Sequence, residues 1–217
     1  MQVIADGSSV AVIGDGKLGL LVAQVLAMQA ERHNWQVVLF GRHQAKLSLV
    51  EGCAGTEVVS EHTATTHAAV RAQHGRRSNT NDCHTNYAHT MPCMMPRTHS
   101  QAFDVTVEAC GKPEGFTLAL ALTRPLGTVV LKSTCSLDGH AAAPQWSAAA
   151  NDVVVQEKRV IGSRCGPFAP ALEALQDARV KRLVGAMVHG EYALADVEAA
   201  IAKASSKGTL KVQLVMG

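Results

Sequence analysis

The chain has 217 residues, a formal net charge of +2, and 47% apolar against 18% charged residues. This length is enough for one large domain with a full hydrophobic core, so the fold does not need disulfide bonds to be stable. The small net charge does not indicate a nucleic-acid binder, and no apolar run approaches the roughly 18 residues of a membrane span. We therefore expect a soluble, cytoplasmic protein, without excluding an organelle, whose partner is a small molecule rather than nucleic acid or a membrane.

Short apolar strands alternate with helices along most of the chain. The β-branched run at residues 9–13 ends at a glycine, and residues 17–29 follow with apolar side chains at helical spacing. Further strands are predicted at 36–40, 57–60, 103–107, 127–132 and 159–163, and further helices at 43–50 and 113–122. Apolar strands that alternate with helices are typical of a parallel sheet covered on both faces. The predicted fold class is therefore α/β, a doubly wound parallel sheet of the Rossmann kind.

The last third of the chain is harder to assign. We expect a loop through the alanine-rich residues 141–150, helices at 167–176 and 193–204, and strands at 182–188 and 209–215. The sequence does not decide whether these elements extend the sheet or pack on a neighbouring domain. We treat residues 1–217 as one Rossmann domain with a C-terminal extension.

Residues 62–101 lose all periodicity and are rich in Thr, His, Asn, Arg and Ser. A structureless loop of this length is improbable inside a compact domain, so we interpret it as a disordered insertion between the third and fourth strands, or as sequence foreign to the fold. Cys83, His89, Cys93 and His99 raise the alternative of a metal site, but their intervals match no zinc motif. The chain has no C-x-x-C pair either. We therefore predict free thiols and no metal ligands.

A glycine-rich motif lies between the first strand and the first helix. The string GDGKLG at residues 14–19 fits G-x-G-x-x-G in the strand-turn-helix context that dinucleotide-binding domains require. Gly14 would permit the tight turn, Gly16 would let a pyrophosphate approach the backbone, and Gly19 would let the helix pack on the strand. The free N–H groups of the first helical turn would add donors and a positive dipole. Three glycines that merely shape a turn, or a site for S-adenosylmethionine, remain the alternatives.

The end of the second strand bears on the choice between NAD and NADP. A domain selective for NAD usually places Asp or Glu there, on the adenosine ribose. Here the strand ends in Gly41-Arg42-His43, with Lys46 one turn later. Arg42 could pair with a 2′-phosphate, and Lys46 could contact the ribose or the phosphate. The pattern favours NADP, although an exposed arginine at a strand end is also common.

These segments resemble the nucleotide-binding half of the medium-chain dehydrogenases, the zinc-type alcohol dehydrogenase family. The resemblance covers nearly the whole chain outside residues 62–101. It follows, in order, the stretches VAVIGDGKLGLLVAQVLA, GRHQAKL, FDVTVEACGKPEGF, RPLGTVVLKS, EKRVIGSRCGPF and YALADVEAAIAKASSKGTLKV.

The resemblance implies a set of cofactor-binding residues. It places Gly14, Gly16, Lys17, Leu18 and Gly19 near the pyrophosphate, and Gly41, Arg42 and Lys46 near the adenosine ribose. It places Ala109, Cys110 and Gly111 beside the cofactor at the end of the fourth strand, Lys132 and Ser133 near the nicotinamide, and Lys211 near the phosphates. Each also has a structural interpretation, such as core filler for Cys110 or surface charge for Lys132 and Lys211.

The chain also departs from the family. Family members carry a barrel-like domain that supplies the ligands of the catalytic zinc, and we expect this chain to lack it, because only eight residues precede the first strand. We therefore predict an NADP- or NAD-binding domain of an oxidoreductase, without catalytic residues of its own. The alternative is a non-catalytic nucleotide-binding or sensor module; a methyltransferase is disfavoured by the missing acid. Family members often pair through the edge of this sheet, which leaves a homodimer open.

Overall fold

The computed structural model describes residues 4–59, 103–134 and 143–216, without the side chains of residues 143–146. Within these residues, six parallel strands form one sheet in the order β3-β2-β1-β4-β5-β6. The strands are β1 Ser9–Ile13, β2 Gln36–Gly41, β3 Gly55–Val58, β4 Phe103–Glu108, β5 Thr123–Leu131 and β6 Arg159–Gly162. The connecting helices are α1 Lys17–His33, α2 Gln44–Leu47, α4 Pro113–Leu122 and α5 Ala143–Val155. The prediction of a doubly wound Rossmann fold is confirmed; the predicted insertion at 62–101 lies outside the described residues.

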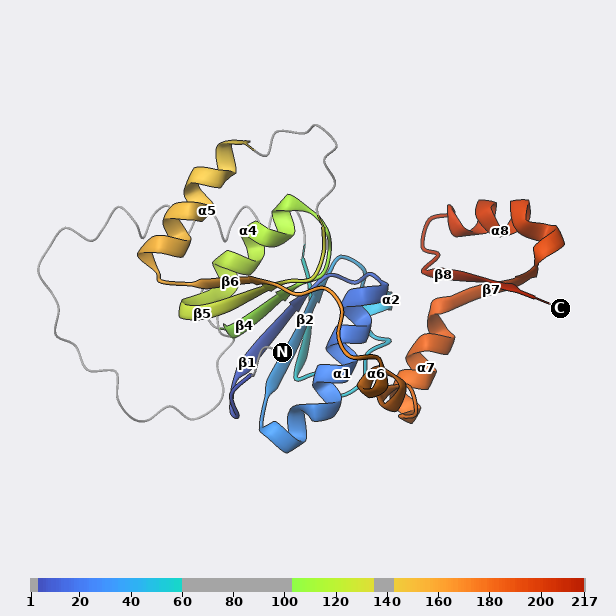
Figure 1. The fold of residues 1–217 in the computed structure, drawn as a ribbon, viewed down its shortest axis with the longest axis horizontal. Coiled ribbons are helices and arrows are strands. Elements are labelled where there is room, and N and C mark those ends of the chain that lie inside the picture. The colour runs from blue at the N-terminus through green and yellow to red at the C-terminus, as the bar shows by residue number, and fades with distance from the viewer. Residues whose placement is uncertain (1–3, 60–102, 135–142, 217) are drawn as a thin grey trace, which may run out of the picture.

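The sheet has a core on each face, because alternate residues of every central strand point to opposite sides. Val10 and Val12 of β1 pack with Leu20 of α1 on one face, whereas Ala11 and Ile13 pack with α4 on the other. In Figure 1, α1 lies on one side of the sheet and α4 and α5 lie on the other. Burial on both faces explains why these strands are apolar throughout.

The longest described helix, α1, sets the position of the first loop. It begins after Gly16 and ends at Asn34, which adopts a left-handed conformation (φ 55°) and donates its N–H to the carbonyl of Ala30. Arg32 and His33 in the last turn face the negative end of the helix dipole. Both ends of the helix therefore have a local sequence reason, and the N-terminus is fixed against the end of β1.

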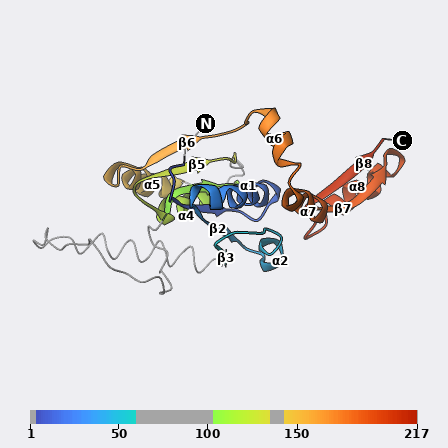
Figure 2. The ribbon, with the colours of Figure 1, turned by 90° about the horizontal axis from the view of Figure 1, so that it is seen from below.

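The rest of the chain forms an appendage beside the sheet. It comprises α6 Phe168–Ala174, α7 Ala178–Met187, β7 Val188–Ala193, the 3-10 turn Leu194–Asp196, α8 Val197–Ala204 and β8 Lys211–Val215. β7 and β8 pair in parallel as a separate two-stranded sheet. In Figures 1 and 2, β7, β8 and α8 project from the side of the main sheet, beyond α7. No helix in the described part of the chain combines the length and hydropathy of a membrane span.

Two secondary-structure predictions were wrong. The strand predicted at 182–188 is instead most of α7, because Val180, Leu183 and Met187 are spaced for one helical face and are buried. The side chain of Asp177 caps this helix by accepting the N–H of Arg179 at 2.8 Å. The loop predicted through 141–150 is wrong where the structure describes it, because residues 143–150 belong to α5; alanine is the strongest helix former, and Ala149 packs toward the core.

Candidate nucleotide-binding site

The glycine loop after β1 is held in one conformation by close backbone packing. Gly14 has a φ of +125°, and its N–H donates to the carbonyl of Phe40 at 2.8 Å. A Cβ at Gly14 would lie 2.8 Å from the carbonyl oxygen of Ala109, and a Cβ at Gly19 would collide with the carbonyl oxygen of Gly14. The chain therefore needs glycine at both positions for the fold itself.

Gly16 differs from these two glycines because nothing in the described protein crowds it. It is the N-cap of α1, with φ −82° and ψ 176°, and no described heavy atom lies within 4 Å of the position a Cβ would take. No side chain caps the helix, and its first turn contains no acidic residue. The first N–H groups of α1 thus point to open space, as an anion-binding helix N-terminus requires.

The loop lies where the strand order reverses. The chain runs from β1 outward to β2 and β3 on one side, then returns beside β1 and runs outward again through β4, β5 and β6. In doubly wound sheets, ligands bind in the crevice outside the carboxyl ends of the strands at this point. The contact between Gly14 and Ala109 brings the loops after β1 and β4 together here.

The loops after β4 and β5 also meet at this edge. Gly111 has a φ of +69°, and a Cβ there would lie 3.6 Å from the Cβ of Ser133. The structure therefore brings together the predicted residues of three loops: Gly14, Gly16, Lys17, Leu18 and Gly19; Ala109, Cys110 and Gly111; and Ser133. Their contact with a nucleotide stays a prediction.

A buried carboxylate that the sequence reasoning missed fixes the loop after β4. Glu108 is 1% exposed, and its Oε1 accepts the N–H of Cys110 at 2.7 Å and of Gly111 at 2.9 Å. Its backbone carbonyl accepts the N–H of Lys132 at 2.9 Å. An acid at the end of an otherwise apolar strand was the signal that could have found it, because such a group needs partners when buried.

A second missed carboxylate belongs to the glycine loop. Oδ2 of Asp15 accepts the backbone N–H of Arg42 at 2.9 Å and of His43 at 2.8 Å, and lies 2.7 Å from Nδ1 of His43. Burial raises the pKa of Asp15, but these hydrogen bonds from His43 and Arg42 outweigh it, so the pKa lies below its usual value. Asp15 is therefore a charged clamp between the glycine loop and the turn after β2.

The four predicted cationic residues outside the glycine loop are placed differently. Arg42 is exposed beside this clamp and Lys46 lies one turn into α2, half-buried. Lys132 donates to the carbonyl of Arg164 at 2.6 Å, which ties its ammonium group to the segment after β6. Lys211 is exposed at the start of β8, in the separate sheet. The proposed roles of Lys132 and Lys211 toward a cofactor stay predictions.

The described residues contain no group of three or more His, Cys, Asp or Glu side chains that could hold a metal ion. Zinc therefore does not fit this part of the chain, and we assign no step to it. Cys53, Cys110 and Cys165 form no disulfide bond within the described residues, and burial raises the pKa of Cys53 to about 11. The cluster Cys83, His89, Cys93 and His99 lies outside the described residues.

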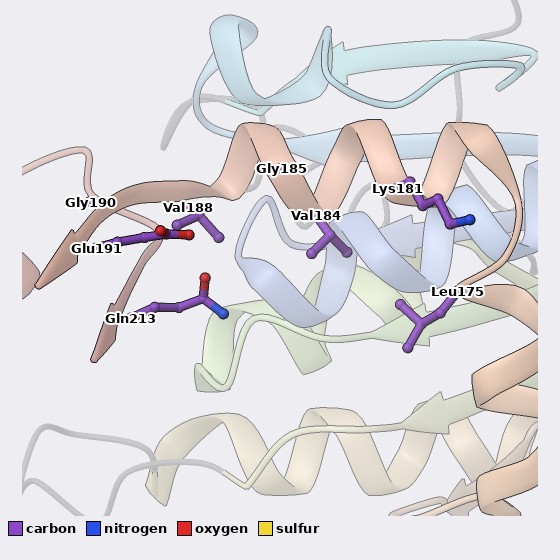
Figure 3. A pocket seen from close by; sticks show the side chains of 8 residues that line it. All are labelled: Leu175, Lys181, Val184, Gly185, Val188, Gly190, Glu191 and Gln213. Carbon is purple, nitrogen blue, oxygen red and sulfur yellow. The ribbon is translucent and has the colours of Figure 1, made fainter. Parts of the chain in front are cut away.

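A separate cavity of about 500 Å³ lies between α7 and the two-stranded sheet. In Figure 3, Leu175, Val184 and Lys181 line it from the helical side, and Glu191 and Gln213 line it from the strands. None of the predicted cofactor-binding residues lines this cavity.

Several solved structures share this architecture. S. aureus TarJ in complex with NADPH matches with a TM-score of 0.66 and 16% identity over 99% of this chain. A putative zinc-binding dehydrogenase from Sinorhizobium meliloti bound to NADP matches with a TM-score of 0.62 and 22% identity over 98%. L-idonate 5-dehydrogenase from Escherichia coli matches with a TM-score of 0.59 and 21% identity over 97%. The chain shares its fold with these three structures.

The chain spans 57%, 53% and 50% of the lengths of these three chains. No protein-family model and no curated protein matches it. At these sequence identities the likeness establishes the fold, so the predicted resemblance to the nucleotide-binding half of zinc-type dehydrogenases is confirmed at that level.

Proposed function

We propose that the chain is the nucleotide-binding part of a zinc-type alcohol dehydrogenase-like oxidoreductase, and that it binds NADP(H) in preference to NAD(H). The observation that carries this proposal is the open backbone at Gly16, at the N-terminus of α1 and at the point where the strand order reverses. A pyrophosphate could reach the helix N–H groups there without meeting a side chain. The NADPH and NADP in the TarJ and S. meliloti structures support the same cofactor class.

The preference for NADP(H) rests on the cations that follow β2. Arg42 and Lys46 are the basic residues on this turn, and the side chain of Arg42 is exposed. A guanidinium group binds a phosphate through two hydrogen bonds, which a ribose hydroxyl cannot match. We therefore assign the 2′-phosphate to Arg42, with Lys46 as a second contact.

Calorimetric titration of the purified chain with NADPH and NADH tests this proposal, with S-adenosylmethionine as the ligand that a methyltransferase would bind. We expect one nucleotide per chain and tighter binding of NADPH. Arg42→Ala should weaken NADPH and leave NADH nearly unchanged, whereas Arg32→Ala, an exposed arginine in the last turn of α1, should change neither. If neither NADPH nor NADH binds to the chain, the proposal is wrong.

A non-catalytic nucleotide-binding module is the second candidate, because no metal cluster occurs among the described residues. An assay for alcohol-dependent reduction of NADP with added zinc tests whether the chain itself catalyses the reaction. Binding without turnover fits both the module and the nucleotide-binding part of a larger enzyme, whereas turnover would contradict the prediction that the chain has no catalytic residues of its own.

We also propose that two copies of the chain pair through β6, one of the two outer strands of the main sheet. Val160 of this strand is 36% exposed, which is unusual for a valine in a strand beside the core. Light scattering after size-exclusion chromatography should give twice the chain mass, and Val160→Lys should give the monomer. A wild-type monomer at all concentrations would contradict the pairing.

A further inference from the structure

The end of β2 has no acidic side chain of its own, yet a carboxylate lies there. Gly41 is the last residue of β2, and a Cβ built on it would lie 2.6 Å from the Cβ of Asp15 and 3.1 Å from its Cγ. The space that a side chain at position 41 would enter is therefore filled by the side chain of Asp15. The glycine loop supplies, from the neighbouring strand, the acid that the strand end lacks.

The geometry of this carboxylate leaves one oxygen available. Three hydrogen bonds converge on Oδ2, from the N–H groups of Arg42 and His43 and from Nδ1 of His43. Oδ1 accepts no hydrogen bond from the described residues, and the side chain is 13% exposed. No described side-chain oxygen is both fully buried and without a partner, so Oδ1 keeps some contact with solvent. A hydroxyl donor can reach it.

We infer that Asp15 is a selectivity-determining residue, whose Oδ1 accepts a hydrogen bond from the adenosine 2′-hydroxyl of NAD(H) and whose charge opposes the 2′-phosphate of NADP(H). This inference rests on the proposed function. Asp or Glu at the end of β2 recognises the ribose in NAD-selective domains, and Asp15 brings the same chemistry to the same place from another loop. Its Oδ2 also occupies two backbone N–H groups that a phosphate would otherwise bind.

Charges of both signs meet at this point. Arg42 and Lys46 favour the 2′-phosphate, whereas Asp15 opposes it, with His43 as its direct neighbour at 2.7 Å. The preference for NADP(H) is therefore a difference between opposing interactions, and NAD(H) binds to the same site. Removing Asp15 should enlarge the preference, and removing Arg42 should reverse it.

The test is Asp15→Asn, with the ratio of NADPH to NADH affinity as its readout. The amide oxygen can still accept the N–H groups of Arg42 and His43, while its NH₂ group offers a donor where Oδ1 was. We expect the ratio to rise about tenfold. Asp6→Asn is the matched control, because Asp6 also pairs with a histidine, His33 at 2.9 Å, in the loop before β1. It should leave the ratio unchanged.

A second measurement uses the wild-type chain and does not depend on the folding of a variant. NADH that lacks the adenosine 2′-hydroxyl should bind about tenfold more weakly than NADH, because its contact with Oδ1 is lost. Equal affinity, or an unchanged ratio in a folded Asp15→Asn chain, overturns the inference while leaving dinucleotide binding intact. Failure of the wild-type chain to bind either dinucleotide overturns the proposed function instead.

Discussion

Replacing Gly16 with alanine should separate nucleotide binding from folding. Gly16 has φ −82° and ψ 176°, which alanine adopts without strain, and the new methyl group would meet no described atom within 4 Å. Alanine narrows the unfolded ensemble, which favours folding by about 0.4–1 kcal/mol, but it is a poorer N-cap than glycine, so the two effects oppose each other and the free energy of unfolding should change by less than about 1 kcal/mol. The methyl group would, however, keep a pyrophosphate from the helix N–H groups. Loss of one charge-assisted hydrogen bond, about 1.5–3 kcal/mol, weakens NADPH roughly ten- to hundredfold.

Two assays on the same variant check this prediction: urea unfolding monitored by circular dichroism, and calorimetric titration with NADPH. Gly185→Ala is the control, because Gly185 belongs to another helix, α7, and a Cβ at this position also meets open space. It should keep full affinity. Gly14→Ala should instead unfold more readily, owing to its φ of +125° and the carbonyl oxygen 2.8 Å from its Cβ. Undiminished NADPH affinity in Gly16→Ala would refute the assignment of the pyrophosphate to this loop.

Three further predictions concern buried polar groups. Glu108→Ala should lower the free energy of unfolding by about 1–3 kcal/mol, because two N–H groups of the next turn lose their acceptor, and unchanged urea unfolding would contradict this. Lys158→Ala should lower the free energy of unfolding by about 3–5 kcal/mol in the same assay, because the ammonium group is fully buried and lies 3.1 Å from Asp152. A decrease below about 1 kcal/mol would contradict a buried ion pair. Burial raises the pKa of Asp104, but hydrogen bonds, chiefly from Ser9, outweigh this effect, so the pKa lies below its usual value. The stabilisation by the charged Asp104 carboxylate is therefore complete above the usual pKa of an aspartate and is lost as pH falls through the lowered pKa, so acid unfolding should show a shallower pH dependence in Asp104→Asn.

Local periodicity accounts for the part of the fold that the sequence predicts. β1 and α4 have the bounds expected from their apolar runs and from Pro113, which suits the first helical position. The two-faced core requires the continuous apolar strands that indicated a parallel sheet. The glycine spacing likewise predicts the turn, since Gly19 is fixed by its close approach to Gly14 within one strand-turn-helix unit.

The misses come from contacts between segments far apart in the chain. Asp15 and the turn at residues 42–43 are 27 and 28 residues apart, and only the pairing of β1 with β2 brings them together. The prediction that no acid contacts the adenosine ribose was based only on side chains at the end of β2. The strand predicted at residues 182–188 lies mostly within α7, where packing of one helical face on the core selects the helix.

Hydrogen exchange with and without NADPH tests the central claim most directly, because it locates the nucleotide on the chain. The account predicts slower exchange in peptides that cover residues 14–20, 41–46 and 109–111, with little change in α7 and β7. Saturating NADPH that leaves these three loops unprotected, or protects only the cavity lined by Leu175 and Glu191, would contradict it.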